Sequence, residues 1–453
     1  MEFLIRLAQW HMTFRVAELE AIATLIGADI EIISYDDESP YCIVRLPNEE
    51  AARALIKRCI LAKDIYELWG HGTNYDEVHA DVKQRTPHLW AQYENVQFGF
   101  DLDSYVGKRS QAERIEIVKS FSYLGFKGPL KLKNPENRWL IMERYFSPSG
   151  IPEAEREKNP KPLNIYFGRY LGKSDRSSIF TYELKKRSYI STTTMDAELS
   201  LVTANIALAA PGKVFYDPFV GTGSFLVAAA HFGALTMGSD IDPRSFRGKD
   251  EERNGEISIL RNYKQYGTTS KYVDCFTSDL TNTPLRNAPL LDGIICDPPY
   301  GVREGLRVLG TRNGKLIEPV MIDGVYAHYR EGYIPPKRPY GFEAMQKDIL
   351  DFAARSLVVN GRLAMWMPTA LDGDHLTVPM HPNLELINVC VQSFGNWARQ
   401  LMTYRRLPEG EVSDISEGRI KVDNDGVTAS EVNEFRRKYF RRFQTKRTGG
   451  TTE

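Results

Sequence analysis

The stretch from Val214 to Ala230 constrains the fold of this chain most strongly. An apolar run, Val214 to Phe219, breaks into Val220-Gly221-Thr222-Gly223-Ser224 and continues with helical spacing from Phe225 to Ala230. A strand that enters a glycine turn and opens a helix brings backbone N–H groups close to a ligand. Because glycine also serves merely to pack a strand against a helix, the turn alone predicts a βα unit and leaves its ligand open.

Acidic residues follow the next two apolar runs. Asp240 comes after Ala234 to Gly238, and Asp279 comes after Tyr272 to Ser278. Asp240 lies 19 positions after Gly221, near the spacing of about 20 for a ribose-binding acid; Asp242 is the alternative. Any one of these acids could be a turn or cap residue. Together they predict the ligand crevice at the carboxyl ends of a parallel, doubly wound sheet.

The fourth apolar run, Leu291 to Cys296, ends in Asp297-Pro298-Pro299-Tyr300. Two prolines impose an extended backbone and remove two donors, so the Asp297 carboxylate and the Pro298 carbonyl both serve as acceptors. An exocyclic amino group that donates to both has its lone pair aimed at a methyl donor, without a strong base or a metal. Tyr300 supplies a ring on which a base stacks, worth roughly 1–3 kcal/mol. This turn predicts amino methylation of a nucleobase.

The amino-terminal half predicts a ferredoxin-like βαββαβ module over residues 1–74. Asn48 is the expected N-cap of its second helix, and Gly27 ends the first. The expected elements are strand Phe3–Leu7, helix Val16–Ile26, hairpin Ile30–Ser34 with Tyr41–Leu46, helix Glu49–Ile60 and strand Ile65–Trp69.

Residues 75–187 form a second predicted region, residues 188–445 the catalytic domain, and residues 446–453 a flexible tail. The second region is expected to contain a helix over Ser110–Tyr123 that ends at Gly125. Its expected strands are near Phe98–Phe100 and at Trp139–Phe146, Leu163–Tyr170 and Ile179–Lys185. The chain of 453 residues, 42% of them hydrophobic, is long enough for two or three cores.

Charge and cysteine usage narrow the class of protein. Lys and Arg total 58 against 59 Asp and Glu, so no overall cationic field attracts nucleic acid and any contact needs local patches or a partner. Five widely spaced cysteines indicate reduced thiols, not disulfides or a metal site. With no secretion signal and no apolar run long enough for a bilayer, we expect a cytoplasmic protein.

Two basic regions are candidates for RNA phosphate contacts. One follows the catalytic turn, with Arg303, Arg307, Arg312 and Lys315. The other is a predicted carboxy-terminal helix, for which docking on its own domain is an equal alternative. Its basic residues are Arg436, Arg437, Lys438, Arg441 and Arg442.

These motifs resemble the class I, Rossmann-like amino methyltransferases, which use S-adenosylmethionine. The resemblance rests on Asp217-Pro-Phe-Val-Gly-Thr-Gly-Ser, Gly238-Ser-Asp-Ile-Asp and Asp297-Pro-Pro-Tyr, with Ser191-Thr-Thr-Thr-Met-Asp-Ala-Glu ahead of them. It implies that Asp240 holds the ribose and Asp279 the adenine amino group. The other cofactor-site residues implied are Thr193, Thr194, Asp217, Phe219, Gly221 and Gly223.

The order of domains resembles the THUMP-containing tRNA methyltransferases, in which a Rossmann-like domain follows an α+β ferredoxin-like and THUMP tRNA-binding region. Gly301-Val-Arg-Glu-Gly-Leu-Arg and a hairpin over Gly395–Tyr404 are similar to the eukaryotic tRNA (guanine-10-N2)-methyltransferases. That resemblance implies a tRNA substrate and a heterodimer with a small zinc-binding activator subunit. Tyr272–Ser278 is apolar enough to be the sheet edge that the activator covers, unless the chain covers this edge itself.

Three other functions remain open at this point. A DNA or rRNA amino methyltransferase would use the same pocket. A protein glutamine methyltransferase also places an amide nitrogen at such a turn, although Asp297 and the βαββαβ start argue against it. A non-catalytic tRNA-binding scaffold is disfavoured because the glycine turn, the acids and the catalytic turn are all intact.

Overall fold

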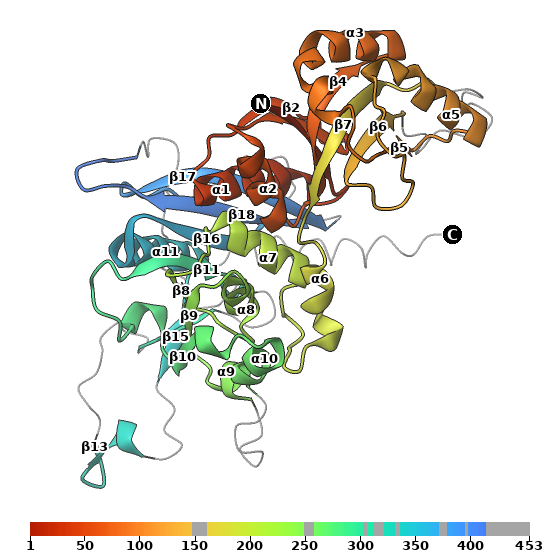
Figure 1. The fold of residues 1–453 in the computed structure, drawn as a ribbon. Coiled ribbons are helices and arrows are strands. Elements are labelled where there is room, and N and C mark those ends of the chain that lie inside the picture. Colours follow the sequence, from red (N-terminus) through yellow and green to blue (C-terminus); the bar gives the residue numbers. More distant parts are fainter. Residues whose placement is uncertain are drawn as a thin grey trace, which may run out of the picture. The chain divides into compact units, whose positions relative to one another are not determined.

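The computed structural model describes residues 1–146, 161–248, 258–301, 306–310, 321–330, 336–370, 378–394 and 397–413. The chain divides into two compact units, Met1–Ser177 and Ser178–Glu453 (Figure 1). The tail predicted at 446–453 lies outside the described residues. The boundaries predicted near 74 and 187 stay predictions.

The first unit begins with the predicted βαββαβ order. The Asn48 side chain accepts a hydrogen bond from the Ala51 N–H at 2.8 Å, and Gly27 ends the first helix with a left-handed φ of 66°. Both are the capping features that the sequence indicated. The elements are β1 (Glu2–Leu7), α1 (Met12–Ile26), β2 (Glu31–Ser34), β3 (Tyr41–Arg45), α2 (Glu49–Arg58) and β4 (Ala62–Gly72).

The rest of the first unit extends the same sheet. Its strand order is β2-β3-β1-β4-β7-β6-β5, so the two predicted regions share one set of hydrogen-bonded strands. Strands β5 and β6 pair in parallel and the other neighbours are antiparallel. The added elements are α3 (Tyr75–Arg85), α4 (Trp90–Tyr93), β5 (Phe98–Tyr105), α5 (Gln111–Ser120), β6 (Asn137–Arg144) and β7 (Asn164–Lys173).

This sheet curls strongly. Arg6 on β1 and Asp103 on β5 form an ion pair of 2.8 Å, although four strand spacings separate them in the sheet order. In a flat sheet that separation would be about 19 Å. The Tyr105 hydroxyl also reaches Gln9 at 3.3 Å. The curl encloses a buried cluster of Leu4, Tyr41, Ile43, Tyr66, Leu68, Leu140, Met142 and Tyr166.

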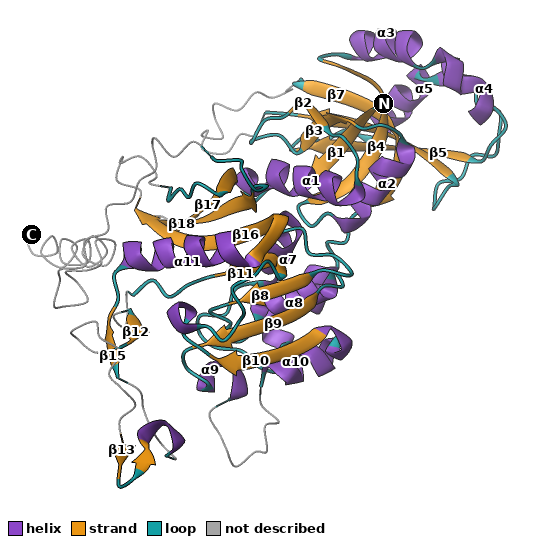
Figure 2. Ribbon diagram, turned by 90° about the vertical axis from the view of Figure 1, so that its left-hand side faces the viewer, coloured by secondary structure: helices purple, strands orange, loops and turns teal. Residues whose placement is uncertain are grey.

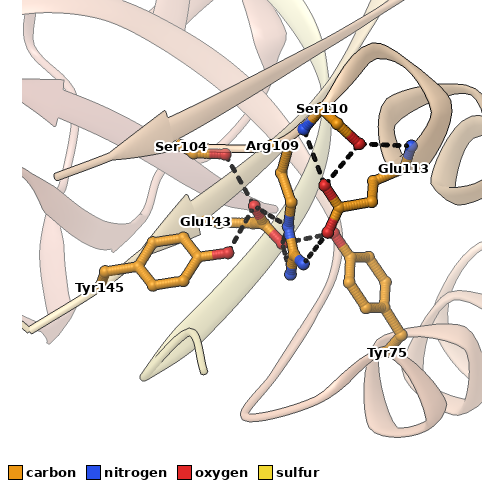
Figure 3. A network of polar contacts seen from close by, with 7 residues as sticks. All are labelled: Tyr75, Ser104, Arg109, Ser110, Glu113, Glu143 and Tyr145. Carbon is orange, nitrogen blue, oxygen red and sulfur yellow. Dashed lines mark hydrogen bonds and ion pairs between the residues drawn. The ribbon is translucent and has the colours of Figure 1, made fainter. Parts of the chain in front are cut away.

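A buried carboxylate organises the far end of the unit (Figure 3). Glu143 on β6 has a fully buried side chain and pairs with Arg109 at 2.8 Å. It also accepts hydrogen bonds from the hydroxyls of Tyr75, Ser104 and Tyr145 at 2.8, 2.7 and 3.1 Å. Because Arg109 precedes the Ser110–Glu113 capping box of α5, this one carboxylate ties α3, β5 and the start of α5 to β6.

The second unit contains a seven-stranded sheet in the order β10-β9-β8-β11-β16-β18-β17. Strands β10, β9, β8, β11 and β16 are mutually parallel, and β18 and β17 add antiparallel pairs. Figure 2 shows β8, β9 and β10 side by side. The strands are β8 (Val214–Asp217), β9 (Leu235–Asp240), β10 (Tyr272–Thr277), β11 (Leu291–Cys296), β16 (Leu357–Ala370), β17 (Leu384–Phe394) and β18 (Trp397–Arg406).

Helices cover both faces of this sheet, which is the predicted Rossmann-like fold. Along β16, Met365 and Met367 belong to the core formed with α11, whereas the Trp366 indole donates to Thr203 of α7 at 3.2 Å. Successive strand residues point to opposite faces, so α11 and α7 lie on opposite sides. The helices are α6 (Ser178–Thr181), α7 (Ala197–Ile206), α8 (Ser224–His231), α9 (Arg244–Arg247), α10 (Ile259–Tyr266) and α11 (Phe342–Ser356).

Short strands lie between β11 and α11. They form two antiparallel pairs, β12 with β15 and β13 with β14. Their bounds are β12 (Arg307–Leu309), β13 (Met321–Ile322), β14 (Val325–Tyr326) and β15 (Lys337–Pro339). No helix among the described residues is long and apolar enough to cross a bilayer.

Two sequence predictions need correction. The strand predicted at Ile179–Lys185 is wrong: helix α6 ends at Thr181, and a 3-10 turn spans Leu184–Lys186. The Tyr182 N–H donates to the Ser178 carbonyl at 3.0 Å, and Tyr182 packs on Tyr266, so tertiary contacts override the β propensity. The hairpin predicted over Gly395–Tyr404 is longer than predicted, because β17 and β18 pair from Leu384 opposite Arg406 to Phe394 opposite Trp397.

Replacing Glu143 with Gln is expected to lower the free energy of unfolding by about 3 kcal/mol, because it removes the buried carboxylate that Arg109 and three hydroxyls share and leaves Arg109 only its exposed partner Glu113. Glu116→Gln is the matched control, since its pair with Lys119 is exposed and contributes about 0–1 kcal/mol. Urea unfolding of the full chain followed by tryptophan fluorescence measures both, because four of the six tryptophans lie in the first unit. Equal losses in the two variants would contradict the organising role of Glu143.

The pH dependence of this effect has a defined sign. Burial raises the pKa of Glu143, but hydrogen bonds from Arg109, Ser104 and Tyr75 outweigh burial and lower it overall. A carboxyl with a lowered pKa stabilises the fold fully above its ordinary pKa and loses that contribution as pH falls through the lowered value. The difference between wild type and Glu143→Gln should therefore shrink below about pH 4.

Candidate active site

The predicted acids lie at the carboxyl ends of neighbouring strands in the second sheet. Asp217 ends β8 and Asp240 ends β9, while Asp297 directly follows β11 and Asp279 lies two residues past the end of β10. These four strands are parallel neighbours, with Asp217 opposite Gly238 and Asp240 opposite Thr277. Their carboxyl ends therefore meet at the place where doubly wound sheets bind ligands.

The glycine turn has the backbone that its sequence predicts. Gly221 and Gly223 have φ angles of 48° and 77°, a left-handed region that favours glycine. The Gly223 N–H donates to the Val220 carbonyl at 2.7 Å, and Gly223 is the N-cap of α8. A Cβ atom on Gly238 of β9 would lie only 2.7 Å from Val220, so glycine there lets the turn pack closely on the neighbouring strand.

Asp240 joins the glycine turn to the end of β9. One carboxylate oxygen accepts the Gly221 N–H at 3.1 Å and the other accepts the Asp242 N–H at 2.9 Å. Burial raises the pKa of Asp240, with these hydrogen bonds acting against it. Asp242 instead pairs with exposed Arg244 at 2.7 Å, which lowers the pKa of Asp242. This geometry favours Asp240 over Asp242 as the carboxylate of the site.

Asp217 and Phe219 shape the entry to the turn. Asp217 is buried, and its carboxylate accepts the Phe219 N–H at 2.9 Å. Burial raises the pKa of Asp217 well above its ordinary value, and the nearby charges of Asp240 and Asp297 raise it further. The half-buried Phe219 packs against the hydrophobic core of the second unit. Asp217 therefore fixes the start of the turn through its hydrogen bond from the Phe219 N–H.

The segment ahead of α7 contacts the glycine turn. The Thr194 hydroxyl lies 2.9 Å from the Thr222 hydroxyl and accepts the Ser191 N–H at 2.7 Å. Thr193 is exposed beside it. Thr194, which the resemblance assigned to the cofactor site, thus lies at the turn itself.

Asp279 is held firmly by the main chain. Its carboxylate accepts the Thr281 N–H at 3.0 Å and the Leu309 N–H at 2.7 Å, and the residue is buried. Asp279 thereby connects the end of β10 to β12, so a stabilising role for this acid is shown independently of any ligand.

The Asp297-Pro298-Pro299-Tyr300 turn places Asp297 beside Tyr300. The Tyr300 hydroxyl donates to the Asp297 carboxylate at 2.5 Å. Pro298 is buried, whereas Pro299 is exposed and Asp297 remains partly accessible. Burial raises the pKa of Asp297 to about 6, although the Tyr300 hydrogen bond and the charge of Arg399 oppose that rise. Above that pH the Asp297 carboxyl is an anion ready to accept an N–H.

Sequence reasoning missed Arg399 on β18, whose charge acts on both Asp297 and Tyr300. The residue stands in the Gly395–Tyr404 segment used for the family resemblance, yet nothing in the local pattern indicated where its side chain would reach. Among the basic residues predicted after the catalytic turn, Arg307 is exposed on β12. Arg303, Arg312, Lys315 and the predicted basic carboxy-terminal helix lie outside the described residues.

A glycine turn and carboxylates at adjacent parallel strand ends, beside an Asp-Pro-Pro-Tyr turn, define a Rossmann-like methyltransferase unit that follows an α+β unit. Residues 1–176 match the family described as Tmrp11 THUMP N-terminal domain, and residues 185–308 match the RMKL-like methyltransferase domain.

Similar proteins cover nearly the whole chain. The tRNA (guanine(10)-N(2))-methyltransferase of Saccharomyces cerevisiae is 43% identical over 98% of this chain and 99% of its own length. The tRNA (guanine(10)-N(2))-methyltransferase TRMT11 of Homo sapiens is 33% identical over 97% of this chain and 95% of its own length. The crystal structure of TrmN from Thermus thermophilus covers 90% of this chain and 100% of its own at 18% identity, with a TM-score of 0.40. Because these relatives are 43% and 33% identical over nearly the whole chain, this chain belongs to the tRNA (guanine(10)-N(2))-methyltransferase family.

Gly238→Ala is expected to destabilise the second unit by about 1–3 kcal/mol, because the new methyl group would overlap Val220 and also approach Leu226 to 3.0 Å. Gly172→Ala is the control: on β7 of the first unit, a Cβ atom meets Ile56 at an ordinary 3.5 Å. Urea unfolding followed by far-UV circular dichroism compares the two. Unchanged stability in Gly238→Ala would show that the turn does not depend on this close approach.

Proposed function

We propose that this protein transfers a methyl group from S-adenosylmethionine to the exocyclic N2 of guanosine at position 10 of tRNA. The Asp297-Pro298-Pro299-Tyr300 turn carries the proposal, because its partly accessible carboxylate stands beside the glycine turn. The target nucleotide follows the relatives' description as tRNA (guanine(10)-N(2))-methyltransferases.

The residues at the strand ends fit S-adenosylmethionine. A Cβ atom on Gly221 would meet nothing nearer than the Phe219 carbonyl at 3.9 Å, so the outer side of the turn is open to a ligand. Asp240 lies directly beneath it, where a carboxylate would accept from ribose hydroxyls. Bound S-adenosylmethionine would supply the sulfonium methyl group. The proposed contacts are Thr193, Thr194, Asp217, Phe219, Gly221 and Gly223, with Asp240 at the ribose and Asp279 at the adenine.

The protein's part in the transfer is to orient the acceptor nitrogen. The Asp297 carboxylate and the Pro298 carbonyl accept the two N–H groups of guanine N2, so that the nitrogen lone pair faces the methyl group. N2 would form a bond to the methyl carbon while the bond from that carbon to the sulfonium sulfur breaks, its electron pair stays on sulfur and a neutral thioether leaves. The proton that N2 then loses would pass to Asp297 or to water. Tyr300 holds Asp297 through its hydroxyl and offers its ring for stacking. A paired guanosine reaches this turn only when it is flipped out of its stem.

Three other functions, methylation of DNA, methylation of a protein amide and a non-catalytic scaffold role, have less support. The first unit matches a THUMP domain, which supports tRNA over DNA as the substrate. Aspartate at position 297 argues against a protein amide nitrogen as the acceptor. The intact carboxylate geometry at four strand ends argues against a non-catalytic scaffold. We further propose a cytoplasmic location.

We also propose that a small zinc-binding activator subunit covers β10. Among the described residues, this strand is the edge of the second sheet and pairs only with β9. Its Val273 side chain is 54% exposed, and an open apolar edge strand invites pairing with another chain. Strand β10 also ends next to Asp279, so a subunit bound there would stiffen one wall of the site.

Asp297→Ala should lower kcat by about 10²–10³ while binding of S-adenosylmethionine is kept, since one preorganised contact to the acceptor nitrogen is lost. The assay uses unmodified tRNA and labelled S-adenosylmethionine, with and without the activator, followed by digestion and mapping of the labelled nucleoside. Asp29→Ala, at an exposed position of the first unit, is the matched control. Unchanged turnover in Asp297→Ala would reject the assigned turn, and label on another base would reject the assigned nucleotide.

Val273→Lys should weaken activator binding at least roughly tenfold, because a lysine replaces an apolar contact at the edge. Val359→Lys is the control, since Val359 is 49% exposed on β16, a central strand of the sheet. Titration of the activator against methylation rate gives both affinities. Equal affinity of the two variants would place the activator elsewhere.

A further inference from the structure

Strand register brings Arg399 toward the catalytic turn. In the parallel pair of β11 and β16, Cys296 lies opposite Met365, so Asp297 stands level with Trp366. In the antiparallel pair of β16 and β18, Trp366 lies opposite Leu401, and Arg399 is two residues further along. Residues two apart share one face of a strand. The long Arg399 side chain therefore extends over Trp366, with the catalytic turn one strand beyond.

The Arg399 side chain is held in one orientation. Its Nε donates to the Gln392 side-chain oxygen at 2.6 Å. Its guanidinium lies 4.9 Å from the centre of the Trp366 ring and 5.3 Å from that of Phe394, distances at which a cation is attracted to an aromatic face. Only 15% of the side chain is exposed. A largely buried cation with this many contacts is costly unless its charge has partners.

One partner is the start of helix α7. The Arg399 guanidinium lies 3.7 Å from the Asp196 carboxylate, and Asp196 is the N-cap of α7 through a 2.9 Å bond from the Leu199 N–H. Asp196 directly follows the Ser191–Met195 segment that contacts the glycine turn. Arg399 is thus connected to the element proposed to lie against the cofactor.

The other partners belong to the catalytic turn. Arg399 lowers the pKa of both Asp297 and Tyr300, against burial that raises them. Among the described residues, the other groups that act on or contact Asp297 are negative or neutral: the Tyr300 hydroxyl, the buried Cys296 thiol and the Asp217 carboxyl. Arg399 is therefore a cation that acts on a carboxyl whose anionic form the transfer requires.

We propose that Arg399 is a positioning residue for methyl transfer, which orients Asp297 and Tyr300 while linking this turn to the start of α7. The inference rests on the proposed function, because it assigns Arg399 a role in that same site. Arg399 acts through Asp297 and is not itself placed against the substrate.

The test is the pH profile of kcat and kcat/KM for tRNA methylation between pH 5 and 9, measured for every variant with the activator subunit present. In Arg399→Gln the acid limb should move up by about one pH unit, because an adjacent cation lowers a carboxyl pKa by about 1–3 units. Activity should then fall roughly tenfold near pH 6 and recover toward pH 9. Arg399→Lys, which keeps the charge, should keep most of the wild-type profile. Arg405→Gln is the matched control, since Arg405 lies on the same strand and pairs with Glu385 at 2.5 Å.

Each outcome decides between the role of Arg399 and the proposed function. An active wild type with the same acid limb in Arg399→Gln, or with a uniform loss at all pH values, overturns the positioning role alone. A wild type that does not methylate tRNA overturns the proposed function. If Arg399→Gln does not fold, Gln392→Leu removes only the acceptor that orients Arg399. That variant should shift the acid limb in the same direction by a smaller amount, and an unshifted limb would again overturn the role.

Discussion

The parallel pairing of β9, β8 and β11 is the constraint on which the catalytic unit depends. This pairing brings the ends of three strands together, so that Asp240, Asp217 and Asp297 lie around one space although they are far apart in sequence. The Asp240 carboxylate then ties the glycine turn to β9 through the Gly221 N–H. A slip of any of these strands by one residue would turn its side chains to the opposite face.

Bringing three carboxyls together in a poorly solvated place has an electrostatic consequence. Burial raises the pKa of all three, and the charges of Asp240 and Asp297 raise that of Asp217 further. The structure counters this with main-chain N–H donors at Asp217 and Asp240, and with the Tyr300 hydroxyl and the Arg399 charge at Asp297. The Asp217 and Asp240 carboxylates accept backbone N–H groups, whereas the Asp297 carboxylate stays partly accessible.

The first unit also contains a buried carboxylate, that of Glu143. Its seven-stranded sheet curls until Arg6 of β1 meets Asp103 of β5, and Glu143 collects one guanidinium and three hydroxyls in a buried position. Buried polar groups of this kind must all be satisfied to be tolerated. They therefore specify how the helices and the sheet end fit together more sharply than apolar packing alone would do.

Local patterns in the sequence by themselves determined the βαββαβ start, the helix caps at Asn48 and Gly27, the glycine turn and the Asp-Pro-Pro-Tyr turn. These features depend on neighbouring residues: proline and glycine restrict or widen the backbone wherever they stand, and apolar periodicity marks the buried face. Other features were decided only by the tertiary structure. Ile179–Lys185 has strand propensity but packs as helix and turn, and Asp240, not Asp242, accepts the Gly221 N–H. The charge of Arg399 acts on Asp297 although 102 positions of sequence separate them. Strand order and register set those contacts, and both arise from long-range pairing that no local pattern records.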